Sequence, residues 1–394
     1  MKWIPVGALR GALITLPLIL SAPVQGGALQ KATVSQESRA PTVEWKPPYT
    51  VLPLPKDAAI LTEKLQGNDS AVWLDGEILT FLHRDAAARV DVTGGVQLPM
   101  QRFEGTNLWA LQLKMPDWDR AFLSYAFVTP EALRKRQVFF QSWFGANAPA
   151  RPVHAEALQG ALITRTMHSN GMNQDRKLTV YLPPNASGKD LPAFFMADGQ
   201  GCESFARVLE PLILAGKVRP VAIVGVHSGE YDGPPGSYDI LHDHRALEYL
   251  PAPSPRIFAA HLQFFTQEVP DYVAKEFHIS RRRQDRALFG FSNGGTFAAV
   301  AALRMPEVFG SALPFSTGIP ALEIGKIAHP PAFHFVAGEL EPFLVSTRRL
   351  YETLQAKGLP VTLKTYKASH DPEMWQMAFC NLAPLLFPGP NARK

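Results

Sequence analysis

Apolar and polar residues alternate with a period of two between residues 70 and 129 of the chain. The clearest alternating positions are Val90, Val92, Trp109, Leu111, Leu113, Met115, Leu123, Tyr125 and Phe127. Turn residues such as Asp75-Gly76 and Gly94-Gly95 separate these runs, and no helical spacing interrupts them. Several short strands at regular spacing predict a small antiparallel β-sandwich.

The pattern changes after residues 144–152, a segment rich in Gly, Ala, Asn and Pro that we interpret as a linker. Continuous apolar runs then alternate with segments of helical spacing, and the runs lie at residues 178–182, 193–196, 221–226, 287–289, 332–337 and 361–366. Continuously apolar strands are typical of buried parallel sheets. The alternation predicts an α/β fold, with a mainly parallel sheet and helices on both faces. One helix is expected from Phe258 to Phe277, with a kink at Pro270.

The N-terminus has the pattern of a secretory signal. Lys2 and Arg10 flank its start, residues 11–21 are apolar, and Gly26 and Ala28 supply small residues for cleavage. The apolar stretch has the length of a signal peptide and is too short to span a bilayer, which favours export over the alternative of an uncleaved anchor. The chain is therefore expected to be periplasmic or secreted, without stable membrane insertion after cleavage. We divide it into a signal peptide at 1–28, an extended lead-in and sandwich at 29–150, and an α/β domain at 151–394.

Composition narrows the classes of function. Of 394 residues, 46% are hydrophobic and 19% are charged, which argues against disorder and leaves room for two domains. The formal net charge is only +4 and no dense basic run occurs, so nucleic acid is not expected as a partner. The small positive excess favours an anionic small substrate. Cys202 and Cys380 could form a disulfide in an oxidising compartment or remain free thiols, and the sequence leaves both possibilities open.

The segment from Gly290 to Gly294 reads GFSNG and lies between the apolar run at residues 287–289 and an alanine-rich segment at residues 296–303. A Gly-x-Ser-x-Gly turn between a strand and a helix is the nucleophile elbow of the α/β-hydrolases. The sharp turn raises the serine hydroxyl above the sheet, and the glycines avoid collisions with the flanking backbone. The pattern predicts Ser292 as a catalytic nucleophile.

A serine hydroxyl needs a base to take its proton, and in α/β-hydrolases the triad follows the chain order serine, acid, histidine. Three histidines follow Ser292, namely His329, His334 and His370. His334 lies inside an apolar strand, and His329 precedes two prolines well before that strand. His370 directly follows the last strand, where a loop can carry it over the serine, so we predict that it is the base.

The acid is expected in the loop after the strand at residues 332–337, which contains Glu339 and Glu341. Either glutamate could orient the imidazole, or both could simply favour the start of a helix. Asp371 is an unsuitable acid, because a residue adjacent to His370 is poorly placed to orient its neighbour's ring.

The oxyanion that develops during acyl transfer needs two preorganised N–H donors. The first is expected from the amide of Asn293, immediately after the nucleophile. The second is expected from Gly199 or Gln200, in the loop after the strand at residues 193–196. The glycines of that loop let the backbone approach a substrate, or they only mark a tight turn.

Several segments together resemble the putative-esterase family of α/β-hydrolases, which includes esterase D, feruloyl esterases, mycolyltransferases and enterochelin esterases. The segments that carry this resemblance are residues 196–199, 245–249, 290–295, 305–310, 338–342 and 368–375. Residues 79–84, Leu108-Trp109 and Tyr125-x-Phe127 are similar to the β-sandwich that precedes the hydrolase in enterochelin esterases. The resemblance implies an α/β-hydrolase catalytic domain and favours Glu341 over Glu339 as the acid.

The resemblance also implies a serine esterase that needs no metal or organic cofactor. Its small-molecule ester substrate would be a catecholate siderophore trilactone, handled as the ferric complex. A feruloyl or acetyl esterase acting on an acylated polysaccharide is the alternative within enzymes. A non-catalytic binding protein for carbohydrate or siderophore, built on a hydrolase scaffold, is the alternative from another class.

Arg245 and Trp375 are the expected substrate-binding residues. For Arg245 the alternative is a structural pair with Glu248, one helical turn away. Trp375, like Tyr231 and Tyr238, either lines the substrate cleft or only packs. The segment at residues 242–244, which reads His-Asp-His, lacks a third spaced ligand and is interpreted as a solvated loop and not as a metal site.

Overall fold

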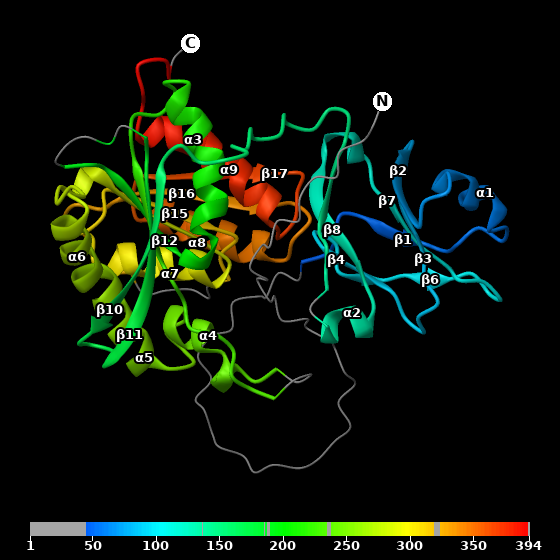
Figure 1. Ribbon diagram of the computed structural model, residues 1–394, viewed down its shortest axis with the longest axis horizontal. Coiled ribbons are helices and arrows are strands. Elements are labelled where there is room, and N and C mark those ends of the chain that lie inside the picture. The colour runs from blue at the N-terminus through cyan, green and yellow to red at the C-terminus, as the bar shows by residue number, and fades with distance from the viewer. Residues whose placement is uncertain are drawn as a thin grey trace.

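The computed structural model describes residues 45–135, 137–184, 186, 190–234, 238–318 and 324–392. The expected signal peptide and most of the extended lead-in lie outside these residues. Figure 1 shows two bodies side by side, a smaller one built from the N-terminal strands and a larger one built from the rest of the chain. Strand β9 ends at Phe144 and strand β10 begins at Ala161. We call residues 50–144 the sandwich domain and residues 161–392 the α/β domain.

The sandwich domain consists of two antiparallel sheets. The first has the order β1-β7-β3-β2 with β6 added to β7, and the second has the order β5-β4-β8-β9. The strands are β1 Thr50–Leu52, β2 Ser70–Asp75, β3 Ile78–Arg84, β4 Asp91–Gly94, β5 Leu98–Pro99, β6 Gln101–Arg102, β7 Leu108–Lys114, β8 Phe122–Val128 and β9 Gln141–Phe144. Their inward side chains, such as Phe81, Leu111 and Leu123, form one buried cluster. The alternation in the sequence therefore predicted this sandwich correctly.

The α/β domain is built on an eight-stranded sheet with the order β10-β11-β13-β12-β14-β15-β16-β17. The strands are β10 Ala161–Ser169, β11 Gln174–Leu182, β12 Ala193–Ala197, β13 Ala222–Val226, β14 Arg286–Phe291, β15 Ser311–Phe315, β16 Ala332–Gly338 and β17 Val361–Tyr366. Strands β10 and β11 are antiparallel to their neighbours, and every other pair is parallel. The predicted α/β class with a mainly parallel sheet is confirmed.

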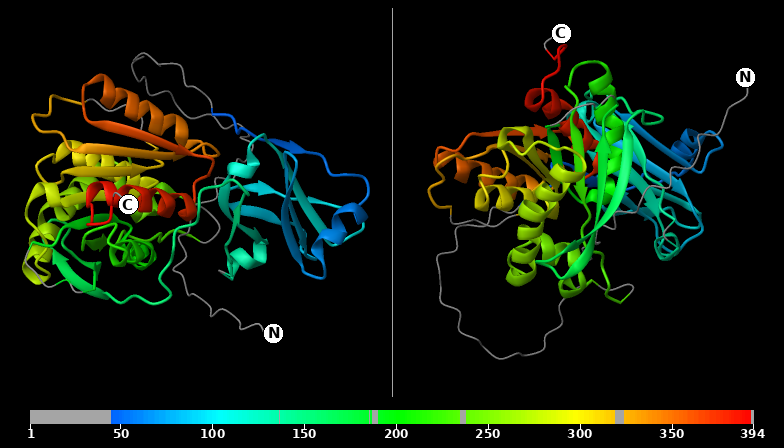
Figure 2. Two further views of the ribbon diagram at one scale, coloured as in Figure 1. Left: turned by 90° about the horizontal axis from the view of Figure 1, so that it is seen from above. Right: turned by 60° about the vertical axis from the view of Figure 1, so that its left-hand side comes forward.

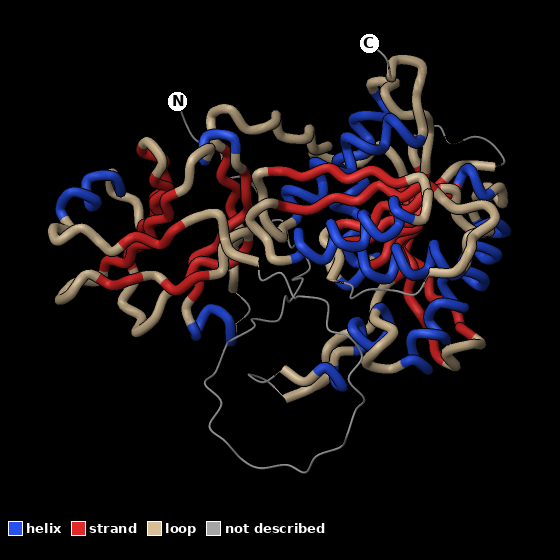
Figure 3. The backbone as a smooth tube through the Cα atoms, turned by 180° about the vertical axis from the view of Figure 1, so that it is seen from behind, coloured by secondary structure: helices blue, strands red, loops and turns tan. Residues whose placement is uncertain are grey.

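Helices cover both faces of this sheet, as Figures 2 and 3 show. On one face, α3 Cys202–Leu214 and α9 Pro372–Leu386 pack on the sheet through residues such as Phe205 and Phe379. On the other face lie α4 His244–Tyr249, α5 Pro255–Gln263, α6 Val269–Glu276, α7 Asn293–Arg304 and α8 Phe343–Ala356. Each face buries its own hydrophobic cluster, so both sides of the central strands are apolar.

The helix expected between Phe258 and Phe277 is interrupted. Helix α5 continues into a π-helical turn, Phe264–Glu268, before α6 begins at Val269. Pro270 lies in the first turn of α6 and lacks the N–H that an uninterrupted α-helix would use. The π-helical turn just before this proline is wider than an α-helical turn, because its N–H groups bond to carbonyls five residues earlier. The irregularity therefore lies at residues 264–268, before the kink expected at Pro270.

The two domains meet at the carboxyl edge of the large sheet, where β17 and α9 lie beside β8 (Figure 1). Phe122 donates its backbone N–H to the Lys367 carbonyl at 3.0 Å. The Phe122 ring packs edge-on against Tyr366, with centroids 6.0 Å apart. Leu340, from the loop after β16, joins the buried cluster of the sandwich. Parallel strands end at this edge, so the interface lies where an α/β fold presents functional groups.

Candidate active site

Ser292 occupies a sharp turn between β14 and α7. Its backbone has φ 57° and ψ −128°, a conformation that residues other than glycine rarely adopt. Its N–H donates to the Phe315 carbonyl of the neighbouring strand at 3.0 Å. A Cβ atom at Gly290 would collide with the Gly294 carbonyl, and one at Gly295 would collide with the Phe315 carbonyl. The glycines of the GFSNGG segment are therefore needed to close this turn against the next strand.

Glu341 lies in the loop after β16 and is 1% exposed. Its Oε1 accepts hydrogen bonds from Gly338 N at 2.7 Å and from Ser316 Oγ at 2.9 Å. Its Oε2 accepts a hydrogen bond from His370 Nδ1 at 2.5 Å. A buried carboxylate with three donors is satisfied and fixed in orientation.

The His370 ring is held on both sides by aromatic side chains. Phe343 stacks on it at 4.4 Å between centroids, and Trp375 meets it edge-on at 5.0 Å. Because Nδ1 donates to the carboxylate of Glu341, the neutral ring carries its lone pair on Nε2. That Nε2 atom is buried and has no hydrogen-bond partner among the described residues. The arrangement leaves the histidine ready to accept a proton at Nε2.

Four neighbouring parallel strands each deliver one residue to the same edge. Ser292 follows β14, Ser316 follows β15, Glu341 follows β16 and His370 follows β17. Trp375 links the two ends of this row, because its ring stacks on Phe291 at 4.2 Å and contacts His370. Within the described residues no hydrogen bond joins Ser292 Oγ to His370 Nε2. Such bonds are often long in a free enzyme and tighten only when substrate is bound.

The expected oxyanion donors lie on two segments that touch each other. Asn293 is the first residue of α7, and Gly199 and Gln200 form the start of the short helical turn η3, Gly199–Gly201. The leading amides of a helical turn have no partner within the turn. A Cβ atom at Gly294 would lie 2.9 Å from Asp198 Oδ2, so the loop after β12 is pressed against the elbow. The Gln200 side chain points elsewhere, since its Nε2 donates to Ser228 Oγ at 2.9 Å.

Arg245 braces these two segments. Its Nε donates to Asp198 Oδ1 at 2.6 Å and its Nη2 donates to Asp198 Oδ2 at 2.8 Å. The pair with Glu248 that the sequence suggested as an alternative is not formed, because Glu248 binds Arg176 at 2.6 and 2.8 Å. The Arg245 side chain keeps 22% of its surface exposed, so a contact with substrate stays a prediction.

Trp375 is 1% exposed and lies behind the reacting groups. Its Nε1 donates to Ser316 Oγ at 3.0 Å, and Ser316 in turn donates to Glu341. This environment fits the packing alternative better than a direct substrate contact. Ser316 itself was missed, because no motif surrounds it. Its only signal is its position directly after an apolar strand, where its φ of 51° turns the chain at the sheet edge.

The loop before α4 holds the residues that the sequence suggested for a substrate cleft or a metal site. Tyr231 and Tyr238 stack at 5.9 Å between ring centroids. Both His242 and His244 bond to the carboxylate of Asp232, at 2.9 and 2.8 Å. Within the part of the chain that the structure describes, no group of three or more His, Cys, Asp or Glu side chains is placed to hold a metal ion.

Cys202 and Cys380 are not joined by a disulfide, which decides between the two possibilities that the sequence left open. Cys202 begins α3 and Cys380 lies in α9.

Among the described helices, none combines the length and apolar character that a bilayer crossing needs.

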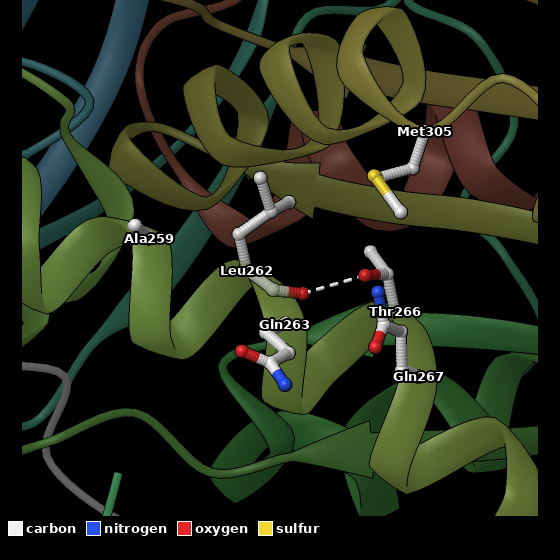
Figure 4. A pocket seen from close by; sticks show the side chains of 6 residues that line it. All are labelled: Ala259, Leu262, Gln263, Thr266, Gln267 and Met305. Atoms are coloured by element: carbon white, nitrogen blue, oxygen red, sulfur yellow. Dashed lines mark hydrogen bonds between the residues drawn. The ribbon is translucent and has the colours of Figure 1, made fainter. Parts of the chain in front are cut away.

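A hollow of about 340 Å³ lies between α5, the π-helical turn and the end of α7 (Figure 4). It is lined by Ala259, Leu262, Gln263, Thr266, Gln267 and Met305. The Thr266 hydroxyl is satisfied, because it donates to the Leu262 carbonyl at 2.7 Å. Met305 follows the last turn of α7, whereas Ser292 precedes its first turn, and a helix of this length is about 18 Å long. The hollow is therefore separate from the predicted catalytic residues.

Comparisons with known proteins support the fold of the chain. Residues 169–323 match the family model of the putative esterases. A search of curated proteins found no match.

Among solved structures, the enterobactin esterase from Shigella flexneri in the presence of enterobactin has a TM-score of 0.64 and 20% identity, covering 82% of this chain and 97% of that chain. The ferric enterobactin esterase from Salmonella typhimurium has a TM-score of 0.63 and 17% identity, covering 82% and 98%. The chain thus has the two-domain fold of the enterobactin esterases, and its residues 169–323 match the putative-esterase family.

Proposed function

We propose that this chain is an exported serine esterase that hydrolyses carboxylic esters through Ser292, His370 and Glu341. The observation that carries the proposal is the 2.5 Å bond between Glu341 and His370 Nδ1, which leaves Nε2 free at the edge where the serine turn ends. Export is proposed from the signal pattern at residues 1–28.

In the proposed reaction, Ser292 Oγ attacks the ester carbonyl while His370 Nε2 takes its proton. The amide of Asn293 and that of Gly199 or Gln200 donate hydrogen bonds to the oxyanion. His370 then returns the proton to the leaving alcohol, and Glu341 stabilises the imidazolium between the two steps. Water, activated by the same histidine, cleaves the acyl-enzyme. These residues account for the whole reaction without a metal or an organic cofactor.

We propose a catecholate siderophore trilactone as the substrate. The support is the shared two-domain fold, since the Shigella flexneri enzyme has been crystallised in the presence of enterobactin and of 2,3-dihydroxy-N-benzoyl-serine. The formal net charge of +4 includes Lys2 and Arg10 of the proposed signal peptide, so the exported chain keeps a charge of +2, which only mildly favours an anionic ligand such as a ferric catecholate.

The proposal is tested with a simple aryl ester and a fluorophosphonate probe. Ser292→Ala should abolish turnover and labelling while its circular dichroism and melting temperature stay close to those of the parent protein. Ser70→Ala is a suitable control, because Ser70 lies on β2 at the outer edge of the sandwich and should keep full activity. Persistent turnover by Ser292→Ala would refute the assignment. Faster cleavage of feruloylated sugars than of catecholate lactones would retain the chemistry and replace the substrate.

A further inference from the structure

The loop that carries His370 is contacted from the sandwich domain. It leaves β17 at Lys367, whose carbonyl accepts the Phe122 N–H at 3.0 Å, and it enters α9 at Asp371. Asp371 is completely buried. Its Oδ1 accepts the Met374 N–H at 3.3 Å and so caps α9. The catalytic histidine therefore lies between two residues that the other domain touches.

The second carboxylate oxygen of Asp371 faces the sandwich. A Cβ atom added to Gly95 would lie 2.8 Å from Asp371 Oδ2 and 2.6 Å from Leu123 Cβ, so backbone of the sandwich is in contact with this carboxyl. Oδ2 has no hydrogen-bond partner among the described residues. Burial raises the pKa of the Asp371 carboxyl well above its usual range. The Ser124 backbone N–H of the sandwich partly offsets this rise, so close packing and a weak polar interaction with the sandwich together hold the carboxyl.

The loop that carries the acid is held in the same way. Leu340 immediately precedes Glu341 and packs with the buried cluster of the sandwich. The Leu340 N–H donates to the Ala368 carbonyl at 3.0 Å, which ties the acid loop to the histidine loop. Near the start of α9, Glu373 accepts a hydrogen bond from Ser142 on β9. The acid loop and the histidine loop are therefore bonded to each other, and both contact the sandwich.

The segments around Ser292 are held by contacts within the α/β domain. Ser292 N–H bonds to Phe315, and the loop bearing the oxyanion donors is fixed through Asp198 by Arg245 and Tyr249. These partners all belong to the α/β domain. The loops of Glu341 and His370 contact both the sandwich and the α/β domain. A small shift of the sandwich would therefore act directly on the Glu341–His370 pair and only indirectly on the serine.

We propose that the sandwich domain is a positioning part of the catalytic centre, acting through Asp371 and Leu340 to set the Glu341–His370 pair against Ser292. This inference rests on the proposed function. A displacement of about 1 Å in a catalytic group can cost about 100-fold in rate. Disturbing the contact should therefore lower kcat and slow fluorophosphonate labelling, whereas KM for a small aryl ester should change less than about twofold because the binding surface is retained.

Two substitutions test the contact from opposite sides. Gly95→Ala places a methyl group against Leu123 and Asp371, and kcat should fall about 10- to 100-fold. Asp371→Ala removes the cap and the packed carboxyl, and should lower kcat by a similar factor. Asp371→Asn keeps the shape and the acceptor for Met374, so it should restore kcat to within about threefold of the parent.

Leu82→Ala is the matched control for loss of stability alone. Leu82 is buried in a second cluster of the sandwich, with Leu61 and Phe103, and this cluster contains no residue of the α/β domain. The variant should melt at a lower temperature, because large-to-small changes leave a cavity in the core, yet keep the parent kcat when assayed well below its melting temperature.

The inference is overturned if Gly95→Ala keeps full kcat, if Leu82→Ala loses as much, or if Asp371→Asn falls as far as Asp371→Ala. The last outcome would mean that Asp371 acts through the chemistry of its carboxyl group and not through its shape. If the parent protein neither turns over the aryl ester nor reacts with the fluorophosphonate at Ser292, the proposed function fails and the inference fails with it. Turnover by the parent together with unaffected interface variants would remove the inference alone.

Discussion

Replacing Glu341 by glutamine changes one charge and almost no volume, and the structure dictates how the new side chain must lie. Oε1 of Glu341 accepts from two donors, Gly338 N at 2.7 Å and Ser316 Oγ at 2.9 Å. Only the oxygen of the introduced amide can serve both of these donors. Its NH₂ group must therefore face His370 Nδ1, where the native carboxylate accepts a hydrogen bond at 2.5 Å.

An NH₂ group in that position needs an acceptor. The His370 ring meets this need by carrying its proton on Nε2, and in that tautomer it cannot take the proton of Ser292. Trapping the wrong tautomer in a serine triad costs about 10⁴-fold in kcat. This factor corresponds to about 5.5 kcal/mol of lost transition-state stabilisation. We expect Glu341→Gln to lose about this much in kcat with little change in KM, because the acid does not contact the substrate.

The assay is steady-state hydrolysis of a p-nitrophenyl ester, with the rate of fluorophosphonate labelling as a second readout. Glu339→Gln is the matched control in the same loop. Glu339 accepts from Thr365 Oγ1 at 3.1 Å and pairs with Lys367 at 3.3 Å, so its loss should change kcat less than about twofold. Loss of activity in Glu339→Gln with retention in Glu341→Gln would refute our assignment of the acid. Retention of activity in both variants would refute the proposal that a carboxylate orients His370.

Further outcomes follow from buried groups away from the reacting atoms. Arg176→Met leaves the Glu248 carboxylate without its guanidinium, so the free energy of unfolding should fall by about 3 kcal/mol in urea titrations while kcat stays unchanged; an unshifted midpoint would contradict this. Burial raises the thiol pKa of Cys202 and of Cys380 to about 12, so neither should react quickly with a disulfide reagent at pH 8 until the protein is unfolded, when two thiols should appear. Burial lowers the pKa of His261 from 6.5 to about 4, so the unfolded chain takes up this proton first as the pH falls. Stability should drop by about 2 kcal/mol between pH 7 and pH 5, and His261→Phe should remove that part of the pH dependence; an identical pH dependence in the variant would count against it.

The elements that the sequence predicted best are those set by local pattern. The alternation around Leu111 and Leu123 reflects a strand with one buried face, and the Gly-x-Ser-x-Gly segment contains within six residues the steric reason for its own turn. The expected positions of Glu341 and His370 rested on chain order and family position. Parallel strands deliver their ends to one edge, so position along the chain is informative there.

The parts that escaped prediction depend on contacts between distant segments. Ser316 becomes part of the site only because β15 lies between β14 and β16, and no sequence motif records that order. Arg245 forms its ion pair with Asp198, 47 positions earlier in the chain, and not with Glu248 in its own helix. The contact of Asp371 with Gly95 joins two domains, and a pattern within either domain carries no information about it.

The backbone conformation of Ser292 lowers the stability of the folded protein at the position where a hydroxyl is needed for the proposed reaction. A residue with a side chain held at φ 57° and ψ −128° costs about 1–3 kcal/mol relative to a relaxed backbone. Glycine would adopt this geometry at little cost, so the most thermostable residue at position 292 is one that has no hydroxyl. Selection of this chain for heat resistance alone would therefore favour loss of the proposed nucleophile, and screens for robust variants should measure turnover alongside melting.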